Sequence, residues 1–199
     1  MLVVIAARRR SLPAMLALTA MLAFAPSASA VPFQVGMGQG DYFSPTIAII
    51  TQGRNVRWTN NDPSDVHDTV SEQNFWSSEL LSYGQTFSRT FNAAGTYKYL
   101  CTEHADMTGK VQVKVKATAS GRRFTVSVSA LVAPGNFRHV IQRRNPGSSN
   151  WVTLNAGTTA RSVSYTGPAA GTYSFRAAYK RLSPFAQSNW SPPKTLTVS

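Results

Sequence analysis

The chain has 199 residues and a formal net charge of +12, from 20 Lys and Arg against eight Asp and Glu. This length fits one or two domains with hydrophobic cores of their own, and no stretch after residue 30 is apolar enough to span a membrane. The single cysteine, Cys101, excludes an intramolecular disulfide.

Residues 1–30 have the pattern of a secretory signal peptide. Arg8, Arg9 and Arg10 precede an apolar run over residues 16–25, and small residues suited to cleavage follow at 28–30. We therefore expect an exported protein, periplasmic or secreted, that begins near Val31 and is not an integral membrane protein after cleavage. An uncleaved N-terminal membrane anchor is the alternative.

Residues 31–116 have the pattern of short β-strands separated by turns. Val111, Val113 and Val115 alternate with polar residues, as on a strand with one buried face. No segment has a long helical period, so we predict an all-β sandwich or barrel. The expected strands cover residues 46–50, 55–59, 85–91, 96–100 and 111–116.

Residues 117–121 are small and polar and are predicted to be a linker, followed by a second β-rich module at 122–199. Six or seven short strands are expected there, which is the size of one small β-sandwich. The charge changes sharply at the boundary. Residues 31–116 carry seven Lys and Arg against eight Asp and Glu, whereas residues 117–199 carry ten Lys and Arg and no acid. This step predicts two modules with different partners.

Three soft or borderline metal ligands lie within seven residues: Cys101, His104 and Met107. Thiolate and thioether sulfur select copper, and a trigonal copper site needs one further imidazole. His67 fits by position, whereas His139 lies in the basic module and is read as an ordinary strand residue. The alternatives are an inert core thiol at Cys101, a surface role for His67, a packing role for Met107, or a zinc site.

The residues around these ligands resemble the plastocyanin, pseudoazurin and amicyanin group of cupredoxins. The resemblance rests on residues 56–60, His67 and residues 87–111, and the two-residue gap between His104 and Met107 is similar to amicyanin. It implies a Greek-key sandwich with one type 1 (blue) copper ion, held by His67, Cys101 and His104 in the equatorial plane and by Met107 as a weak axial ligand. It also implies that the His104 edge lies at a hydrophobic surface and passes electrons to a partner.

The sequence departs from this family directly after the first histidine. Many relatives have Asn or Thr there, where it ties the two ligand loops together, but this chain has Asp68 followed by Thr69. A carboxylate near copper would lower the redox potential; alternatively, Asp68 points outward while Thr69 ties the loops. The sequence is compatible with both orientations of the Asp68 side chain.

The second module resembles fibronectin type III domains over residues 173–179 and 188–192, although the tryptophan usual on an early strand is absent. The resemblance implies an immunoglobulin-like (fibronectin type III-like) β-sandwich without chemistry of its own. Its positive charge favours an anionic surface or polysaccharide as partner, and no motif for sequence-specific nucleic-acid binding is present. A generic solubilising surface is the alternative.

The function predicted from these features is that of an exported one-electron carrier, not an enzyme, with an appended basic binding module and a redox protein as partner. Copper oxidases and nitrite reductases need further histidine clusters, and only one histidine is left over here. Copper storage or delivery is the first alternative, but the expected mature chain has only two methionines, Met37 and Met107. A structural or adhesion protein is the second alternative.

Overall fold

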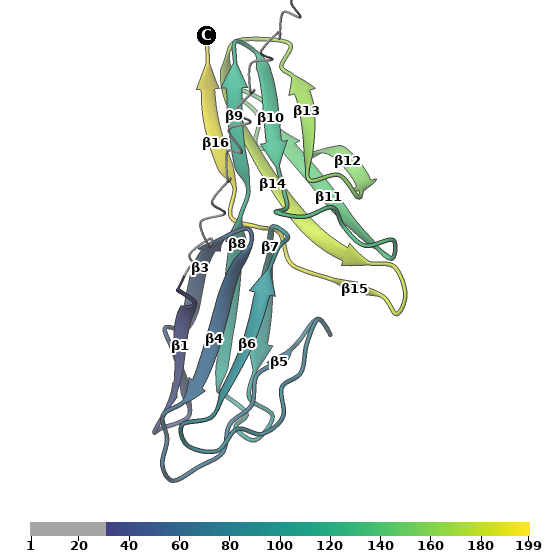
Figure 1. Ribbon diagram of the computed structural model, residues 1–199. Helices are drawn as coiled ribbons and strands as arrows, with labels where there is room; N and C mark the ends of the chain where they lie inside the picture. The colour runs from purple at the N-terminus through teal and green to yellow at the C-terminus, as the bar shows by residue number, and fades with distance from the viewer. Residues whose placement is uncertain (1–30) are drawn as a thin grey trace, which may run out of the picture.

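The computed structural model describes residues 31–199, which form sixteen β-strands arranged as two sandwiches, one above the other (Figure 1). The all-β prediction is confirmed. The predicted signal peptide at residues 1–30 lies outside the described residues. Within residues 31–199, the structure has no helix of the length and apolar character needed to cross a membrane.

The first sandwich packs two four-stranded sheets, ordered β2-β1-β4-β6 and β3-β8-β7-β5. Each sheet is mixed, because β1 runs parallel to β4 and β3 runs parallel to β8 while the other pairs are antiparallel. The strands are β1 (Phe33–Gly38), β2 (Tyr42–Ser44), β3 (Ile47–Thr51), β4 (Arg54–Asn60), β5 (Val70–Ser71), β6 (Thr86–Phe91), β7 (Gly95–Leu100) and β8 (Thr108–Lys114).

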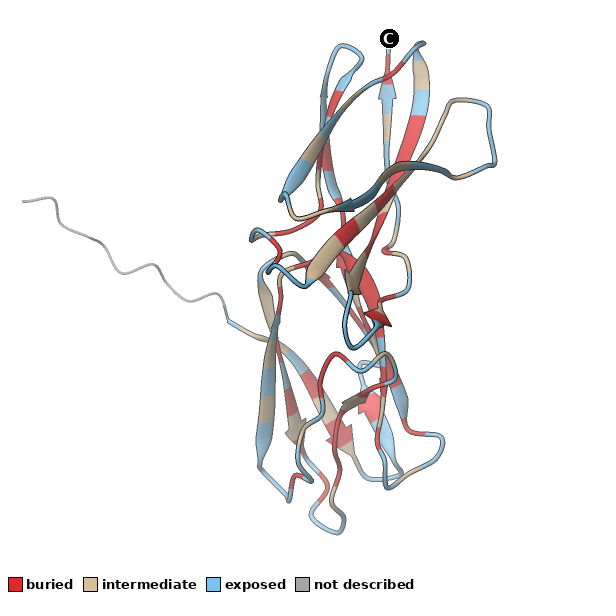
Figure 2. Ribbon diagram, turned by 90° about the vertical axis from the view of Figure 1, so that its right-hand side faces the viewer, coloured by how far each residue is buried: buried red, intermediate tan, exposed pale blue. Residues whose placement is uncertain are grey.

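Trp58 lies at the centre of the first core and is fully buried. Its ring centroid is 5.4 Å from that of Tyr99 and 5.9 Å from that of Trp76. Val111 and Val113 on β8 are buried as their alternation predicts. Buried positions alternate with more exposed ones along β3 and β8, and buried segments recur along the strands of the first sandwich (Figure 2), so the strands that lead to the ligand loops are anchored in a packed core.

The second sandwich packs a three-stranded sheet, β13-β10-β9, against a sheet ordered β12-β11-β14-β15 in which β14 also pairs with β16. Phe124, Tyr173 and Phe175 form its aromatic core. The strands are β9 (Lys116–Ser120), β10 (Arg123–Ser127), β11 (Phe137–Arg144), β12 (Val152–Thr158), β13 (Ser162–Thr166), β14 (Gly171–Arg181), β15 (Ala186–Gln187) and β16 (Lys194–Val198).

The predicted linker at residues 117–121 is wrong as secondary structure, because residues 116–120 form strand β9. This strand pairs with β10 along its whole length, and β8 ends only two residues before it begins. Ala117 is its one buried residue, and the exposed residues are Lys116 and the small residues at 118–120. The segment therefore lacked the large apolar residues that reveal a strand in a sequence.

The two sandwiches also meet along a hydrogen-bonded interface. Thr96 and Asn189 exchange two backbone hydrogen bonds of 2.9 Å, and the Ala94 N–H donates to the Val128 carbonyl at 2.7 Å. The Phe75 ring stacks on Tyr179 with the centroids 6.1 Å apart. The orientation of the two modules is therefore fixed by side-chain packing and backbone pairing as well as by the covalent connection between β8 and β9.

Candidate metal centre

The four predicted ligands come from two loops at one end of the first sandwich. His67 lies between β4 and β5 and is held by two backbone hydrogen bonds with Leu81, of 3.2 and 2.7 Å. Cys101 follows β7 directly, and the loop from Cys101 to Met107 leads into β8. The Cys101 N–H donates to the Met107 carbonyl at 3.0 Å, and the Met107 N–H donates to the His104 carbonyl at 3.1 Å. These bonds close the loop into a compact turn.

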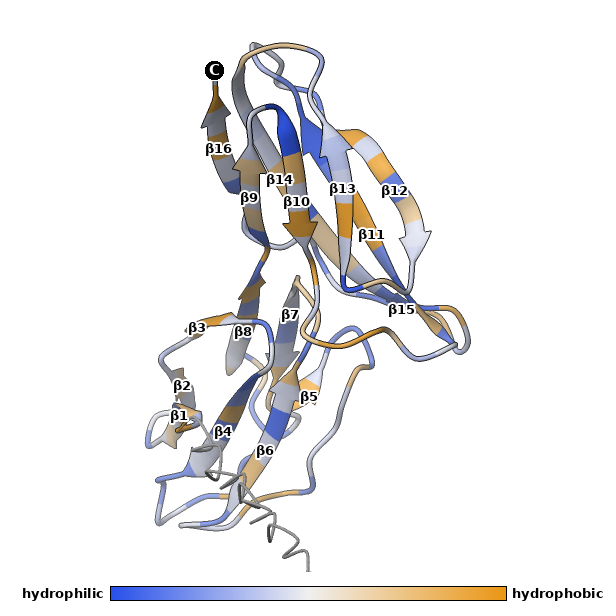
Figure 3. Ribbon diagram, turned by 45° about the horizontal axis from the view of Figure 1, so that its top comes forward, coloured by the Kyte–Doolittle hydropathy of each residue, from blue (hydrophilic) through white to orange (hydrophobic). Residues whose placement is uncertain are grey.

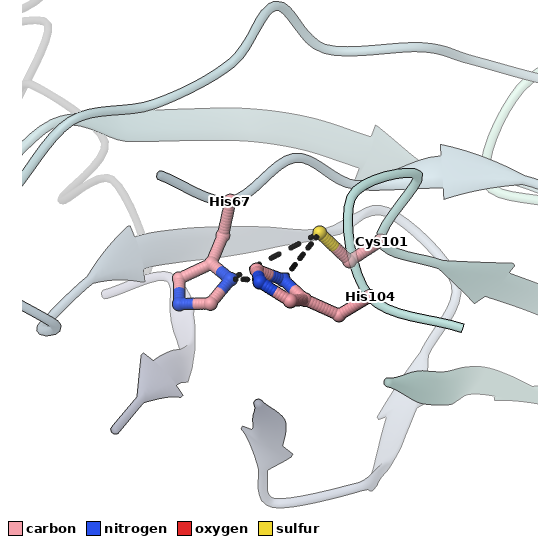
Figure 4. Close-up of side chains that lie close together, drawn as sticks. All are labelled: His67, Cys101 and His104. Carbon is pink, nitrogen blue, oxygen red and sulfur yellow. Dashed lines mark hydrogen bonds between the residues drawn. The ribbon is translucent and has the colours of Figure 1, made fainter. Parts of the chain in front are cut away.

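Three donor atoms converge at this point: Nδ1 of His67, Sγ of Cys101 and Nδ1 of His104 (Figure 4). The two Nδ1 atoms are 3.2 Å apart, and Sγ lies 3.9 Å from His67 and 3.5 Å from His104. A trigonal centre with metal–nitrogen bonds of about 2.0 Å and a metal–sulfur bond of about 2.3 Å sets its donors about 3.5–3.7 Å apart. The observed spacing brackets these values, so the three side chains fit a single trigonal ion.

Met107 is buried in the same apolar cluster as Cys101, with 1% of its surface exposed. The structure therefore brings the donor atoms of His67, Cys101 and His104 together and places Met107 at the end of the same loop, whereas His139 lies in β11 of the other sandwich, stacked on Tyr179. Burial raises the pKa of the Cys101 thiol, while N–H groups of Asp68 and Glu103 lower it. Because the metal binds the thiolate, loading the site requires this thiol to lose its proton.

Asp68, whose role was left open by the sequence, ties the two ligand loops together. Its carboxylate accepts hydrogen bonds from the Thr102 N–H at 2.7 Å and from the Thr102 hydroxyl at 2.5 Å. Its own N–H points to the Cys101 sulfur at 3.5 Å. Thr69 is engaged elsewhere, because its hydroxyl accepts from the Trp76 indole N–H. The carboxylate thus takes the tying role that Asn or Thr has in the family.

Carboxylates also lie beside the outer nitrogens of both imidazoles. His104 Nε2 is 3.3 Å from Asp65 and 3.5 Å from Asp41, and His67 Nε2 is 3.6 Å from Asp62. Hydrogen bonds from Ser64, followed by a smaller contribution from His67, lower the pKa of Asp62. The surface at the His104 edge is therefore acidic on this side, and not purely hydrophobic as the family resemblance implied.

The roles of these three aspartates were not predicted from the sequence. Asp62 and Asp65 lie within five residues of His67, so their position in the same turn was the available signal. Asp41 gave no local signal, because it sits in the turn between β1 and β2 and reaches the site only through the fold. Its backbone φ is +60°, a conformation that side-chain-bearing residues adopt mainly in tight turns.

The comparisons with known proteins match the first sandwich to copper-binding proteins. The family model of copper binding proteins, plastocyanin/azurin family, matches residues 19–114. The chain is 36% identical over 85 residues to amicyanin of Paracoccus versutus, covering 40% of this chain and 63% of the relative. It is 41% identical over 69 residues to amicyanin-alpha of Methylorubrum extorquens, covering 33% of this chain and 58% of that relative. The chain thus spans less than two thirds of the length of these curated relatives.

Two solved structures are also similar. One is a purple cupredoxin from Nitrosopumilus maritimus, with 28% identity and a TM-score of 0.40 over 41% of this chain and 99% of that one. The other is a copper-containing nitrite reductase from Thermus scotoductus, with 27% identity and a TM-score of 0.43 over 46% of this chain and 24% of that one. The family model, the amicyanin relatives and the convergent His–Cys–His donors lead to one conclusion: the first sandwich is similar to the cupredoxins, the copper-binding plastocyanin/azurin family.

Proposed function

We propose that the protein is an exported one-electron carrier whose copper is held by His67, Cys101, His104 and Met107. The observation that carries this proposal is the convergence of two Nδ1 atoms and one thiol sulfur within 3.9 Å of one another. Copper, when bound, supplies one-electron chemistry between its +1 and +2 states. Met107 would supply a thioether as a fourth, weaker donor, since its backbone closes the loop that carries Cys101 and His104.

The protein's contribution is to hold these ligands still. Cys101 is fixed by β7 and by the Met107 carbonyl, His67 is fixed by its pairing with Leu81, and Asp68 joins the two loops. Side chains that keep their positions in both redox states lower the reorganisation energy of electron transfer. Hydrogen-bonding partners of the ligands tune the reduction potential.

Electrons would pass through the partly exposed edge of His104, whose side chain is 17% accessible. Asp41 and Asp65 flank this edge, and each is about half exposed. Glu103 and Asp106 add exposed negative charge within the same loop. A redox partner with a positive surface around its own cofactor would therefore be steered to this end of the molecule.

Copper delivery is the alternative that uses the same ligands. It is less favoured, because Met37 is buried in the core and no methionine cluster is available among the described residues to pass copper along. Catalysis at copper is also less favoured, since the remaining histidine, His139, is buried in the other sandwich. A purely structural or adhesive role would leave the converging donor atoms without a purpose.

Repeated oxidation by ferricyanide and reduction by ascorbate, in the presence of a Cu(I) chelator, separates these functions. A carrier is expected to complete many cycles while keeping one copper per chain. Loss of copper to the chelator within the first reduced phase would instead establish delivery. His67→Ala is expected to reduce the bound copper, whereas the matched variant His139→Phe is expected to retain one copper per chain.

The second sandwich is proposed to be a fibronectin type III-like module that binds an anionic partner and so localises the carrier. Its order of strands, with β9, β10 and β13 in one sheet and the remaining strands in the other, is compatible with that fold. Its ten basic residues and absence of acids support the anionic partner.

A further inference from the structure

The outer face of the larger sheet of the second sandwich carries a row of cations. In the antiparallel pair β11–β14, His139, Ile141 and Ala177 are buried. Arg143 shares their side, since its guanidinium lies 4.6 Å from the ring of Tyr165 in the opposite sheet. Because strand side chains alternate, the residues between these point outward. The cross-strand pairs on that side are Arg138 with Lys180, Val140 with Ala178, Gln142 with Arg176, and Arg144 with Ser174; among them Ala178 and Ser174 are buried, whereas the four cations are partly exposed.

Four cations therefore line this face: Arg138, Lys180, Arg176 and Arg144. Arg138 and Arg144 are six residue steps apart along β11, which corresponds to about 20 Å at the rise of a strand. The strands that carry them include strongly hydrophilic stretches (Figure 3). Among residues 31–199, the ion pairs involve only His67 and His104, so none of the four cations has a carboxylate within salt-bridge distance.

Like charges are close together along this row. Arg138 lies directly opposite Lys180, an arrangement that destabilises a sheet when no counter-charge is present. Burial and, after it, the charge of Arg144 lower the pKa of the Arg176 guanidinium. An anion that bridges these side chains would remove the repulsion.

Two tryptophans hold the arginines in place. The Arg176 guanidinium lies 4.1 Å from the Trp151 ring and 4.7 Å from the Trp190 ring, and Arg144 lies 5.2 Å from Trp151. The Gln142 side-chain oxygen accepts two further hydrogen bonds from Arg176, at 2.9 and 2.7 Å. Stacking orients a planar guanidinium while leaving its remaining N–H groups free for a carboxylate or sulfate.

From this arrangement we propose that the outer face of β11 and β14 binds an acidic polysaccharide along the row Arg138, Lys180, Arg176 and Arg144. A row about 20 Å long matches a linear polymer with repeated anionic groups better than a single small anion. Single-stranded nucleic acid is less favoured, because its binding depends on open aromatic faces and guanidiniums already stack on both tryptophans. This inference deepens the proposed role of the second sandwich and does not depend on copper.

Heparin binding to the purified protein at several salt concentrations tests the proposal. We expect binding that weakens steeply with salt, and no binding to neutral dextran. Arg144→Gln with Arg176→Gln is expected to weaken heparin binding at least tenfold. Arg123→Gln with Arg161→Gln removes the same charge away from this face, from β10 and from the segment before β13, and is expected to change binding less than twofold.

Equal weakening in both double variants would show that net charge alone is responsible, and would overturn the assignment of this face. Tighter binding to a single-stranded oligonucleotide of the same charge would overturn the polysaccharide class. If far-ultraviolet circular dichroism shows that the first variant is misfolded, Arg138→Gln with Lys180→Gln tests the other end of the row. A failed copper assignment would leave these results unchanged, so the two proposals can fail separately.

Discussion

Asp65 and Asp41 lie beside the proposed ligand His104, whose Nε2 is 3.3 and 3.5 Å from them. A carboxylate that accepts from a ligating imidazole makes the ring a stronger donor and stabilises the more highly charged metal. Asp65→Asn is therefore expected to raise the copper potential by an amount on the order of tens of millivolts, limited by solvent screening. Voltammetry measures this shift, and an unchanged potential would show that the contact has no electronic role. Glu79→Gln, another exposed carboxylate, is the control.

His139 is a second residue whose environment has a measurable consequence. It is fully buried, and neither ring nitrogen has a hydrogen-bond partner. Burial lowers its pKa from 6.5 to about 4. Between these values the unfolded chain binds a proton that the folded chain does not, so stability falls as the pH drops from 6.5 towards 4.

The loss from this one group amounts to roughly 3 kcal/mol, at about 1.4 kcal/mol per pKa unit. His139→Phe keeps a ring to stack on Tyr179 and removes the titration. Urea unfolding at pH 7 and pH 4.5 should therefore show a smaller pH-dependent loss in the variant than in the wild-type protein. The same loss in both proteins would contradict the burial argument.

At the scale of the element, the loop from Cys101 to Met107 depends on its link to the His67 loop through Asp68. Both carboxylate oxygens of Asp68 are engaged by Thr102. Asp68→Ala removes both of these part-buried hydrogen bonds to a charged group, at a cost of about 1–3 kcal/mol. Asp68→Asn keeps one side-chain oxygen and is expected to lose less stability than Asp68→Ala.

Thermal unfolding of the apoprotein measures this effect without interference from the metal. Equal stability of Asp68→Ala and the wild-type protein would show that the backbone alone holds the loops together. Thr102→Val removes only the hydroxyl contact. Its unfolding temperature is expected to lie between those of Asp68→Asn and Asp68→Ala.

The elements also show how far sequence patterns reach. Alternation predicted β8 because Val111 and Val113 are large and buried, and the spacing of Cys101, His104 and Met107 predicted one compact loop. β9 was not predicted, because it is stabilised by pairing with β10 and not by large apolar side chains of its own. The contact of Asp41 with His104 was not predicted for a similar reason, since only the turn between β1 and β2 brings the two residues together.

At the scale of the whole molecule, the two sandwiches are expected to unfold as one unit. Phe75 of the first stacks on Tyr179 of the second, and backbone bonds join Thr96 to Asn189. Calorimetry should therefore give a single transition for the wild-type protein. Phe75→Ala with Tyr179→Ala should split it into two, because the aromatic contact between the cores is lost.

Phe185→Ala removes an exposed ring of the second sandwich and should leave the single transition intact. Two transitions in the wild-type protein would show that the modules are thermodynamically independent. This coupling could not be predicted from sequence patterns, because the residues that form it are far apart in the chain and become neighbours only when both sandwiches have formed.

The visible spectrum of the copper-loaded protein shows whether His67, Cys101, His104 and Met107 form one copper centre. Adding one equivalent of Cu(II) to the purified apoprotein should produce an intense thiolate-to-copper absorption band and a blue colour. Cys101→Ser should abolish the band, whereas His139→Phe should retain it. Tight binding of Cu(II) without such a band, or an unchanged band in Cys101→Ser, would contradict the assignment.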